Sequence, residues 1–468
     1  MISYDKIIHM VGEEKNRVNS NISEAHFFNA SSEKRAHFKE RFLKKATKKP
    51  ELNLPLEDFD LNKRKNKGIE RLKKTKERIL ASNTEIELLM RQKTFDSEEW
   101  KLYKKKNQEN LLRIKLIESA HAIQVHPTPA KKVQFNRLNS QLYGRINQRP
   151  FNGIISSKKY NLEKFEPADD LSKKYKTFLL KSMPFRLYPA RFRNEEPIAV
   201  FEKIHAILEK NYPTIFSSLK DNDDHLYNAE ETKKLFEKFM FDLNFDWHVI
   251  VSDKVSVVTD SVTYHSLKLP KDLSRTAKEL RRLAIHEIGV HTARAIYGRQ
   301  NGGPLLEYGT ANYLRAEEGL ATLCECSVDE TFDNKSYQRI IYRYLTAGLA
   351  LGADGKKRNA MEVLNIIAPL LAIENSKDGK ITPEVLDYAM NEAYRHVENA
   401  FRGTDWTTKG CAFLKLKIYY EGLIDNIRYF SKNLDSADDA FRLAMLGKYD
   451  HTSLKSCKDA LFLISIKK

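Results

Sequence analysis

Three absences narrow the classes of protein to which this chain of 468 residues can belong. It has only four cysteines, Cys324, Cys326, Cys411 and Cys457, whose irregular spacing fits neither a disulfide framework nor a CxxC zinc module. No run approaches the roughly 18 consecutive apolar residues that a membrane span requires. The N-terminus, MISYDKIIHMVGEEKN, lacks the long apolar core of a secretory signal, so we expect a soluble protein of a reducing compartment.

Helix-breaking residues are scarce in the N-terminal region, where residues 56–126 contain no proline and a single glycine. Apolar residues at three- and four-residue spacings in this stretch predict two long amphipathic helices. A joint near residues 94–97, at which Asp96 or Ser97 would cap the second helix, predicts a helical hairpin. Residues 126–167 contain prolines and little periodicity, so we interpret them as a linker.

Acidic residues are few in the same region. Residues 1–160 hold 35 Lys and Arg against 19 Asp and Glu, a surplus of 16, whereas residues 161–468 hold 45 against 44. A basic region of this kind predicts an anionic partner, which would be nucleic acid, an acidic protein surface or an acidic peptide. The alternative interpretation is a lysine-rich, solvated helical surface.

The rest of the chain is predicted to be mostly helical around one small sheet. Two helices are expected first, at residues 171–181 and 198–211. Three short strands rich in β-branched residues are expected next, at residues 247–253, 255–258 and 262–269. From residue 272 onward nearly everything predicts helix, with a loop at 298–303. We therefore expect an α+β fold, mostly α, in which a basic helical region with its linker (1–160) precedes a second domain (161–468).

The segment HEIGVH at residues 286–291 carries the strongest chemical signal. Neutral imidazoles are good zinc ligands, and a glutamate beside the first histidine can act as a general base. The two histidines lie five residues apart, however, which places them about 140° apart around a regular helix. They can share one ion only if the helix bulges or ends between them, which Gly289 would permit. The alternative is two histidines packed in a helical core.

A third ligand is expected on the helix predicted at residues 311–326, because a catalytic zinc site uses three protein ligands and one open position. This helix carries three glutamates, Glu317, Glu318 and Glu325. Small residues after Glu318, namely Gly319 and Ala321, would let the helix approach the histidine-bearing helix closely. Of Glu317 and Glu318, we expect one to lie on the surface.

These motifs resemble those of a known family. HEIGVH and the following GRQNGGPLLEYGTANYLRAEEGLA are similar to the HE(I/V)GTH…GR…QEGLA signature of the microtubule-associated tyrosine carboxypeptidases, which remove the C-terminal tyrosine of α-tubulin, and of bacterial relatives named for the QEGLA motif. The resemblance covers roughly residues 165–430, including FRG at 401–403 and an F-x-K-x-x-x-Y-x-x-G pattern at 413–422. Val290 stands where the family usually has Thr, and Glu317 where it has Gln.

The resemblance implies a zincin-like zinc peptidase core. One Zn²⁺ would be held by His286, His291 and Glu318, with Glu287 as the catalytic glutamate. Neither departure from the signature removes a ligand.

The sequence therefore predicts a zinc metallocarboxypeptidase that removes a C-terminal Tyr or Phe from a protein tail. Glu287 would accept a proton from water and pass it to the leaving amine. Tyr419, or Tyr420 beside it, would stabilise the oxyanion. Arg402 and Lys415 would bind the terminal carboxylate of the substrate, since Arg forms bidentate pairs with carboxylates.

The expected partner is an acidic C-terminal tail, with α-tubulin as the substrate that the resemblance implies, in the cytoplasm or in a host cytoplasm if the protein is bacterial. We expect neither a membrane nor a nucleic-acid partner. Two alternatives remain open: a zinc endopeptidase or aminopeptidase acting on other substrates, and a basic module that binds nucleic acid or acidic protein around a structural metal. The second lacks a zinc finger, an RNA-binding signature or a Gly-rich phosphate loop.

Overall fold

Helices dominate the structure and small sheets lie among them, which agrees with the predicted α+β, mostly α fold. The structure is a computed structural model that describes residues 32–48, 65–91, 97–126, 128–183, 195–220, 225–253, 255, 257–328 and 335–467. Within these ranges, no helix combines the length and the apolarity that a bilayer crossing demands. The zincin-like character of the core stays a prediction.

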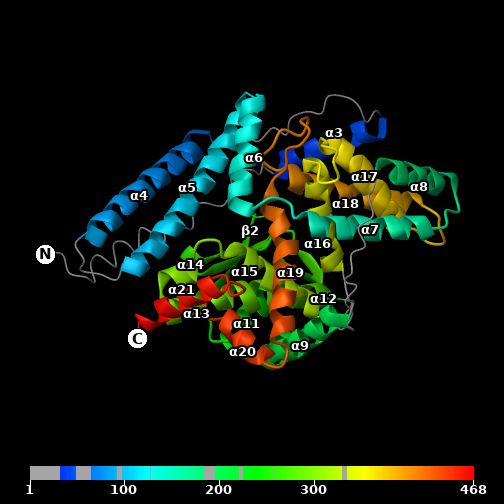
Figure 1. The fold of residues 1–468 in the computed structure, drawn as a ribbon. Coiled ribbons are helices and arrows are strands. Elements are labelled where there is room, and N and C mark those ends of the chain that lie inside the picture. The colour runs from blue at the N-terminus through cyan, green and yellow to red at the C-terminus, as the bar shows by residue number, and fades with distance from the viewer. Residues whose placement is uncertain are drawn as a thin grey trace.

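The predicted helical hairpin is confirmed by α4 (Lys65–Arg91) and α5 (Ser97–Val125), which run side by side at the left of Figure 1. Their apolar faces meet in one cluster that includes Ile79 of α4 and Ile114 of α5. Of the expected joint at residues 94–97, residues 94–96 lie outside the described residues, so capping by Asp96 is not described, and Ser97 is the first residue of α5.

The linker interpretation of residues 126–167 is wrong, because two helices, α6 (Pro129–Tyr143) and α7 (Gln148–Lys164), occupy most of this segment. Pro129 begins α6 instead of breaking it, since the first helical turn needs no N–H from that position. The side chains of Thr128 and Asn147 cap the two helices by accepting backbone hydrogen bonds. Position 160, the predicted boundary, therefore lies inside α7, and the division at that residue stays a prediction.

A second group of helices shares a core with α7 at the upper right of Figure 1. It consists of α3 (Ser32–Lys48), α8 (Asp170–Ser182), α16 (Lys335–Leu351), α17 (Ala360–Glu374) and α18 (Pro383–Phe401). Trp406, which is fully buried, packs edge-on against Phe38 and Phe42 of α3 and so ties this helix to the others.

The lower part of Figure 1 contains the third group, around the largest apolar core. Its helices are α9 (Glu195–Asn211), α10 (Pro213–Ser218), α11 (Ala229–Asp242), α12 (Ala277–Ala284), η2 (Ile285–Thr292), α13 (Ala293–Gly302), α15 (Leu314–Ser327), α19 (Lys417–Lys432) and α20 (Ala437–Ala444). Beside them, α14 (Pro304–Tyr308) and α21 (Leu454–Ser465) share a smaller apolar cluster. The loop expected at 298–303 is wrong, since α13 continues to Gly302. Gly298 is needed there for close packing, because a Cβ at this position would lie 2.1 Å from the carbonyl oxygen of Leu306.

Two small sheets lie in the same part of the molecule. In the first, β1 (Leu226–Asn228) pairs antiparallel with β5 (Ser274–Thr276). In the second, β4 (Ser266–Pro270) lies between β2 (His248–Ser252), which is parallel to it, and β3 (Thr259–Ser261), which is antiparallel. The strand expected at 255–258 is wrong: β3 begins at Thr259, and the β-branched Val257 is exposed. Residues Val262–Tyr264, also expected to be strand, form the 3-10 turn η1.

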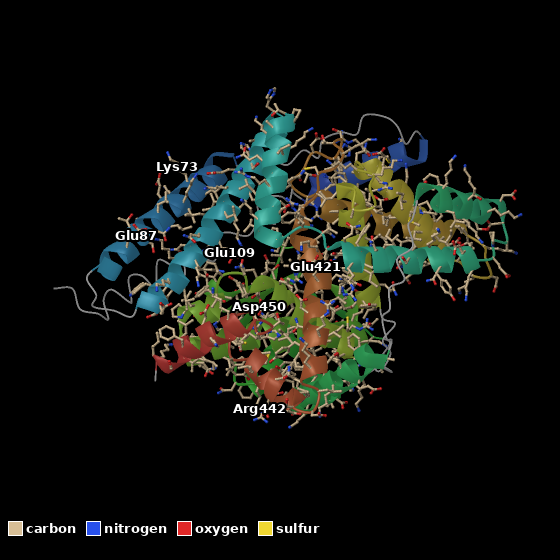
Figure 2. All side chains as sticks on the ribbon, in the orientation of Figure 1. Lys73, Glu87, Glu109, Glu421, Arg442 and Asp450 are labelled. Carbon is tan, nitrogen blue, oxygen red and sulfur yellow. The ribbon has the colours of Figure 1, made fainter. Side chains whose placement is uncertain are left out.

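Helix α19 connects the second and third groups and crosses the middle of Figure 1. Figure 2 shows Glu421 on this helix near the centre of the molecule. The buried carboxylate of Glu421 accepts hydrogen bonds from the Tyr344 hydroxyl of α16 at 2.9 Å and from the Arg315 guanidinium of α15 at 3.0 Å. It also accepts one from the backbone N–H of Asn147 just before α7. One buried side chain thus joins the helices that flank the site described next.

Candidate metal centre

The two histidines lie on η2, a π-helix that interrupts the α-helical path from α12 to α13. Backbone hydrogen bonds of a π-helix span five residues instead of four, so residues five apart stack on one face. The imidazole rings of His286 and His291 accordingly have centroids 4.9 Å apart. The irregularity that the five-residue spacing required is confirmed.

At Gly289 the backbone of the π-helix is supported by a hydrogen bond from a buried tyrosine. The hydroxyl of Tyr212 donates a hydrogen bond to the Gly289 carbonyl at 2.6 Å. A Cβ added at Gly289 would lie 3.4 Å from the ring of Tyr212. A buried tyrosine directly after α9 thus packs against Gly289 and supports the backbone of the π-helix.

Helix α15 brings Glu318 to the two histidines. Its Oε2 lies 3.6 Å from Nε2 of His291 and 4.0 Å from Nε2 of His286. One ligand atom from each of the three residues falls within 4.8 Å of the others. The structure thus brings together the three residues that the sequence assigned as metal ligands.

The expected role of Gly319 is wrong, however. It does not bring α15 toward the histidine-bearing helix but toward α19, where a Cβ at Gly319 would lie 2.2 Å from the carbonyl carbon of Gly422. The paired glycines let the backbones of α15 and α19 touch. This contact sets Glu318 of α15 and Tyr419 of α19 relative to each other.

Each histidine is oriented by a second carboxylate. Nδ1 of His286 lies 3.0 Å from Oε2 of Glu325, and Nδ1 of His291 lies 2.9 Å from Oε1 of Glu317. With both Nδ1 atoms engaged in this way, the Nε2 atoms face Glu318. Carboxylates in this position fix the tautomer and raise the basicity of a ligating histidine.

Neither Glu317 nor Glu318 lies on the surface, so that expectation is wrong. Glu317 is only 1% exposed. Its carboxylate is paired with Arg294 and with Nζ of Lys448, the latter at 3.4 Å. These cations make burial of the charge tolerable, and Lys448 also reaches Asp260 of β3 at 3.3 Å.

The sequence reasoning missed the orienting roles of Glu317 and Glu325. For Glu325 a signal existed, because it lies seven residues after Glu318 and therefore on the same face of α15. For Glu317 no local pattern marks the role, because its partners His291, Arg294 and Lys448 lie 26, 23 and 131 positions away along the chain.

Each charged group in the site stabilises the charged form of its partner. Burial, the largest single cause, would lower the pKa of both imidazoles. The surrounding carboxylates together outweigh it, chiefly Glu325 at His286, and Glu317 and Glu318 at His291, so the pKa of His286 is raised and that of His291 more strongly. Burial likewise opposes ionisation of Glu317, yet Arg294 and Lys448 hold the pKa of this carboxyl far below its usual value. The orienting carboxylates are therefore ionised at neutral pH.

Glu287 behaves differently from the other carboxylates of the site. Burial raises its pKa to about 7, the carboxylates of Asp260 and Glu318 act in the same direction, and the two histidines oppose them. A pKa near neutrality suits a group that accepts a proton and then gives it away. A divalent cation held by the neighbouring ligands would lower this pKa again.

Of the two candidate tyrosines, only Tyr419 faces the site. Burial raises its pKa well above the usual value, and the nearby carboxylates of Glu318 and Glu287 raise it further. Tyr420 instead packs in the core against the ring of Tyr344, with centroids 4.9 Å apart. The structure does not bring Tyr420 to the metal ligands.

The two cations predicted to bind the substrate lie near the site on separate elements. Lys415 of η3 (Leu414–Leu416) is close enough to Glu318 to help lower the pKa of that carboxyl. Arg402, directly after α18, donates to Oδ1 of Asn399 at 2.7 Å. A third cation, Arg343 of α16, was missed, and it lies over the ring of Tyr419 at 5.5 Å from the centroid. Substrate binding by Arg402 and Lys415 stays a prediction.

Two imidazole nitrogens and one carboxylate that converge in this way form the protein ligand set typical of a catalytic zinc site. The carboxylates behind both histidines complete the arrangement that such sites usually have. No curated protein and no solved structure matches this chain. Residues 190–354, which include the three ligand candidates, match the model of the microtubule-associated tyrosine carboxypeptidase family, and the resemblance read from the sequence is confirmed over that range.

Proposed function

We propose that the protein is a zinc metallocarboxypeptidase that removes a C-terminal Tyr or Phe from an acidic protein tail, with the tail of α-tubulin as the leading substrate. The observation that carries this proposal is the convergence of His286, His291 and Glu318 within 4.8 Å, beside Glu287. The family match supports the carboxypeptidase activity and the tyrosine preference. Since α-tubulin is a cytoplasmic protein, we infer action in the cytoplasm.

The residues of the site have distinct roles in this proposal. Zn²⁺ held by the three ligands would supply Lewis-acid activation of the scissile carbonyl and of a water molecule. Glu287 takes the proton from the attacking water and passes it to the leaving amine, for which a pKa near 7 is suitable. Glu317 and Glu325 hold the two imidazoles in the tautomer that presents Nε2.

Tyr419 supplies a hydrogen-bond donor. Its raised pKa keeps the phenol protonated at neutral pH, so the hydroxyl can donate to the oxyanion that develops on the scissile carbonyl. Its place on α19, fixed by the contact of Gly422 with α15, holds this donor beside Glu318.

Metal analysis and a peptide panel test the proposal together. We expect one Zn²⁺ per chain in the wild-type protein, loss of zinc in His286→Ala and Glu318→Ala, and retained zinc without turnover in Glu287→Gln. The wild-type protein should release Tyr from brain tubulin and from Tyr-ended peptides, and should leave C-terminally amidated peptides intact. Full zinc in a His286→Ala/His291→Ala double variant would refute the ligand assignment. Cleavage of amidated peptides would point to an endopeptidase or aminopeptidase instead.

A further inference from the structure

Helix α16 presents a row of polar side chains to the site. Ser336, Arg339 and Arg343 follow one another at spacings of three and four residues, so they share one face of the helix. The first two support the metal ligands indirectly: Oγ of Ser336 donates to Glu325 at 2.6 Å, and Arg339 donates to the same carboxylate at 3.1 Å. Glu325 in turn orients His286. Arg343 lies one turn further along the helix.

Arg343 is half-buried, and its contacts differ from those of the fully buried arginines. Among the described residues it forms no ion pair or hydrogen bond, and its Nε is buried without a partner. By contrast, Arg294 is paired with Glu317 and Arg358 with Asp354.

The nearest carboxylate in this row of contacts does not pair with Arg343. Glu325 is already bound to His286, Ser336 and Arg339, so it offers Arg343 no ready acceptor. A half-buried guanidinium whose Nε is shielded from water and unpaired is suited to bind an external anion.

Two further cations lie near Arg343. Burial lowers the pKa of its guanidinium to about 10, the charges of Arg339 and Arg402 act in the same direction, and Tyr419 and Glu325 oppose them. The buried imidazole of His396 experiences the same field: burial, Arg343 and Arg339 together lower its pKa to about 3. This region therefore favours a bound negative charge.

The position of Arg343, next to the tyrosine that faces the metal ligands, indicates which anion it binds. The ring of Tyr419 contacts Arg343, while Glu318 and Glu287 act on the Tyr419 hydroxyl. A peptide whose scissile carbonyl lies at the metal ligands has its terminal carboxylate one residue further on, about 3.8 Å per Cα step. We propose that Arg343 binds the α-carboxylate of the last residue of the substrate, and that this contact restricts the site to free C-termini.

This inference rests on the proposed function, and it adds a residue outside the set assigned from the sequence. A guanidinium offers a planar fork of N–H donors that matches a carboxylate bidentately. Arg402 and Lys415 would then add positive charge around the anchor rather than form it.

Binding, rather than turnover, tests the anchor. In zinc-loaded Glu287→Gln protein, calorimetry compares a short neutral peptide ending in Tyr with its C-terminal amide. We expect the free acid to bind about 10- to 100-fold more tightly. Adding Arg343→Gln should reduce the ratio to below about 3-fold. Arg343→Lys should keep part of it, because the charge remains while the fork is lost.

The control is Arg395→Gln on α18, an exposed arginine paired with Glu392, which should leave the ratio unchanged. Zinc content and the thermal transition report whether each variant is folded, and if Arg343→Gln is not, the Lys variant decides. An unchanged ratio in a folded Arg343 variant overturns the inference, as does an equal loss in Arg395→Gln or a loss confined to Arg402→Gln or Lys415→Gln. If wild-type protein binds the free acid through Arg343 yet releases no C-terminal residue, the proposed function fails and the anchor stands.

Discussion

At the scale of single residues, Tyr212 provides a direct test of how the π-helix is held. Tyr212→Phe removes the hydroxyl that binds the Gly289 carbonyl and leaves that carbonyl with one hydrogen bond fewer. We expect the free energy of unfolding to fall by about 1–3 kcal/mol and zinc to bind more weakly, because the turn that aligns the histidines loses its support. Denaturant titration and competition with a zinc chelator measure the two effects.

Tyr429→Phe is the matched control for Tyr212→Phe, since its hydroxyl also donates to a backbone carbonyl, that of Ala440, away from the metal ligands. It should lower stability without changing zinc affinity. If Tyr212→Phe leaves zinc affinity at the wild-type value, the hydrogen bond stabilises the fold but does not shape the ligand set.

His396 makes stability depend on pH. Its pKa falls from 6.5 to about 3 in the folded protein, chiefly through burial and then through Arg343 and Arg339. Below pH 6.5 the unfolded chain binds a proton that the folded protein refuses, so stability is lost as the pH falls from 6.5 toward 3. Between pH 7 and pH 5 this residue alone should remove about 2 kcal/mol.

The test of this pH dependence compares His396→Gln with the same substitution at the exposed His126. Urea denaturation at pH 7 and pH 5 gives the difference in unfolding free energy for each protein. His396→Gln should show a difference about 2 kcal/mol smaller than the wild type, and His126→Gln should match the wild type. Equal differences in all three proteins would mean that the imidazole of His396 is not held neutral.

At the scale of elements, the contact between α15 and α19 determines the geometry of the site. A Cβ at Gly422 would lie 2.1 Å from the carbonyl oxygen of Arg315, so Gly422→Ala must push the two helices apart. We expect a loss of about 1–3 kcal/mol from overpacking, together with weaker zinc binding and lower kcat, because Glu318 and Tyr419 move with their helices.

Gly348→Ala serves as the comparison for Gly422→Ala. A Cβ at Gly348 would lie 2.3 Å from the ring of Phe151 on α7. Gly348→Ala therefore strains the fold too, but at a place away from the metal ligands. Both variants should unfold more easily, but only Gly422→Ala should bind zinc less tightly in a chelator competition. Equal zinc affinity in the two proteins would show that the spacing of α15 and α19 does not set the site.

The elements also show what sequence patterns can predict. The five-residue histidine spacing predicted that the helix bulges or ends between the two histidines, because a shared ion and a regular helix are incompatible at that spacing, and the structure shows a π-helix there. The strand expected at 255–258 is displaced to Thr259–Ser261, since β propensity marks residues that suit a strand but not the register that β4 provides. Prolines were interpreted as breakers between residues 126 and 167, although Pro129 occupies the position at which proline begins a helix.

At the scale of the whole molecule, the basic hairpin is packed on the part that carries the candidate ligands. Leu102 of α5 lies in one apolar cluster with Leu306 and Tyr449. The carboxylate of Glu109 accepts a hydrogen bond at 2.8 Å from the backbone N–H of Asn312, just before α15. Deletion of residues 1–125 would expose this interface, so substitution of surface charges is the cleaner test of what the hairpin does.

Residues 1–160 carry a surplus of 16 positive charges, which the chemistry at the metal ligands does not need. Lys73, Lys74 and Arg78 lie exposed on α4, and Figure 2 shows Lys73 on that helix. We expect their replacement by Gln to lower kcat/KM on an acidic protein tail about 10-fold and to change it little on a short neutral peptide ending in Tyr, because exposed charges concentrate an oppositely charged substrate.

The difference between the two substrates should shrink as salt rises above about 0.15 M, where charges further apart than about 8 Å are screened. An unchanged thermal transition shows that the triple variant is folded, and replacement of the exposed Lys458 on α21 controls for the loss of positive charge elsewhere. If both substrates lose efficiency equally, or if neither does, the hairpin supports the fold through α5 and its charge does not select the substrate. A loss confined to the acidic tail would instead make α4 part of the surface that recognises it.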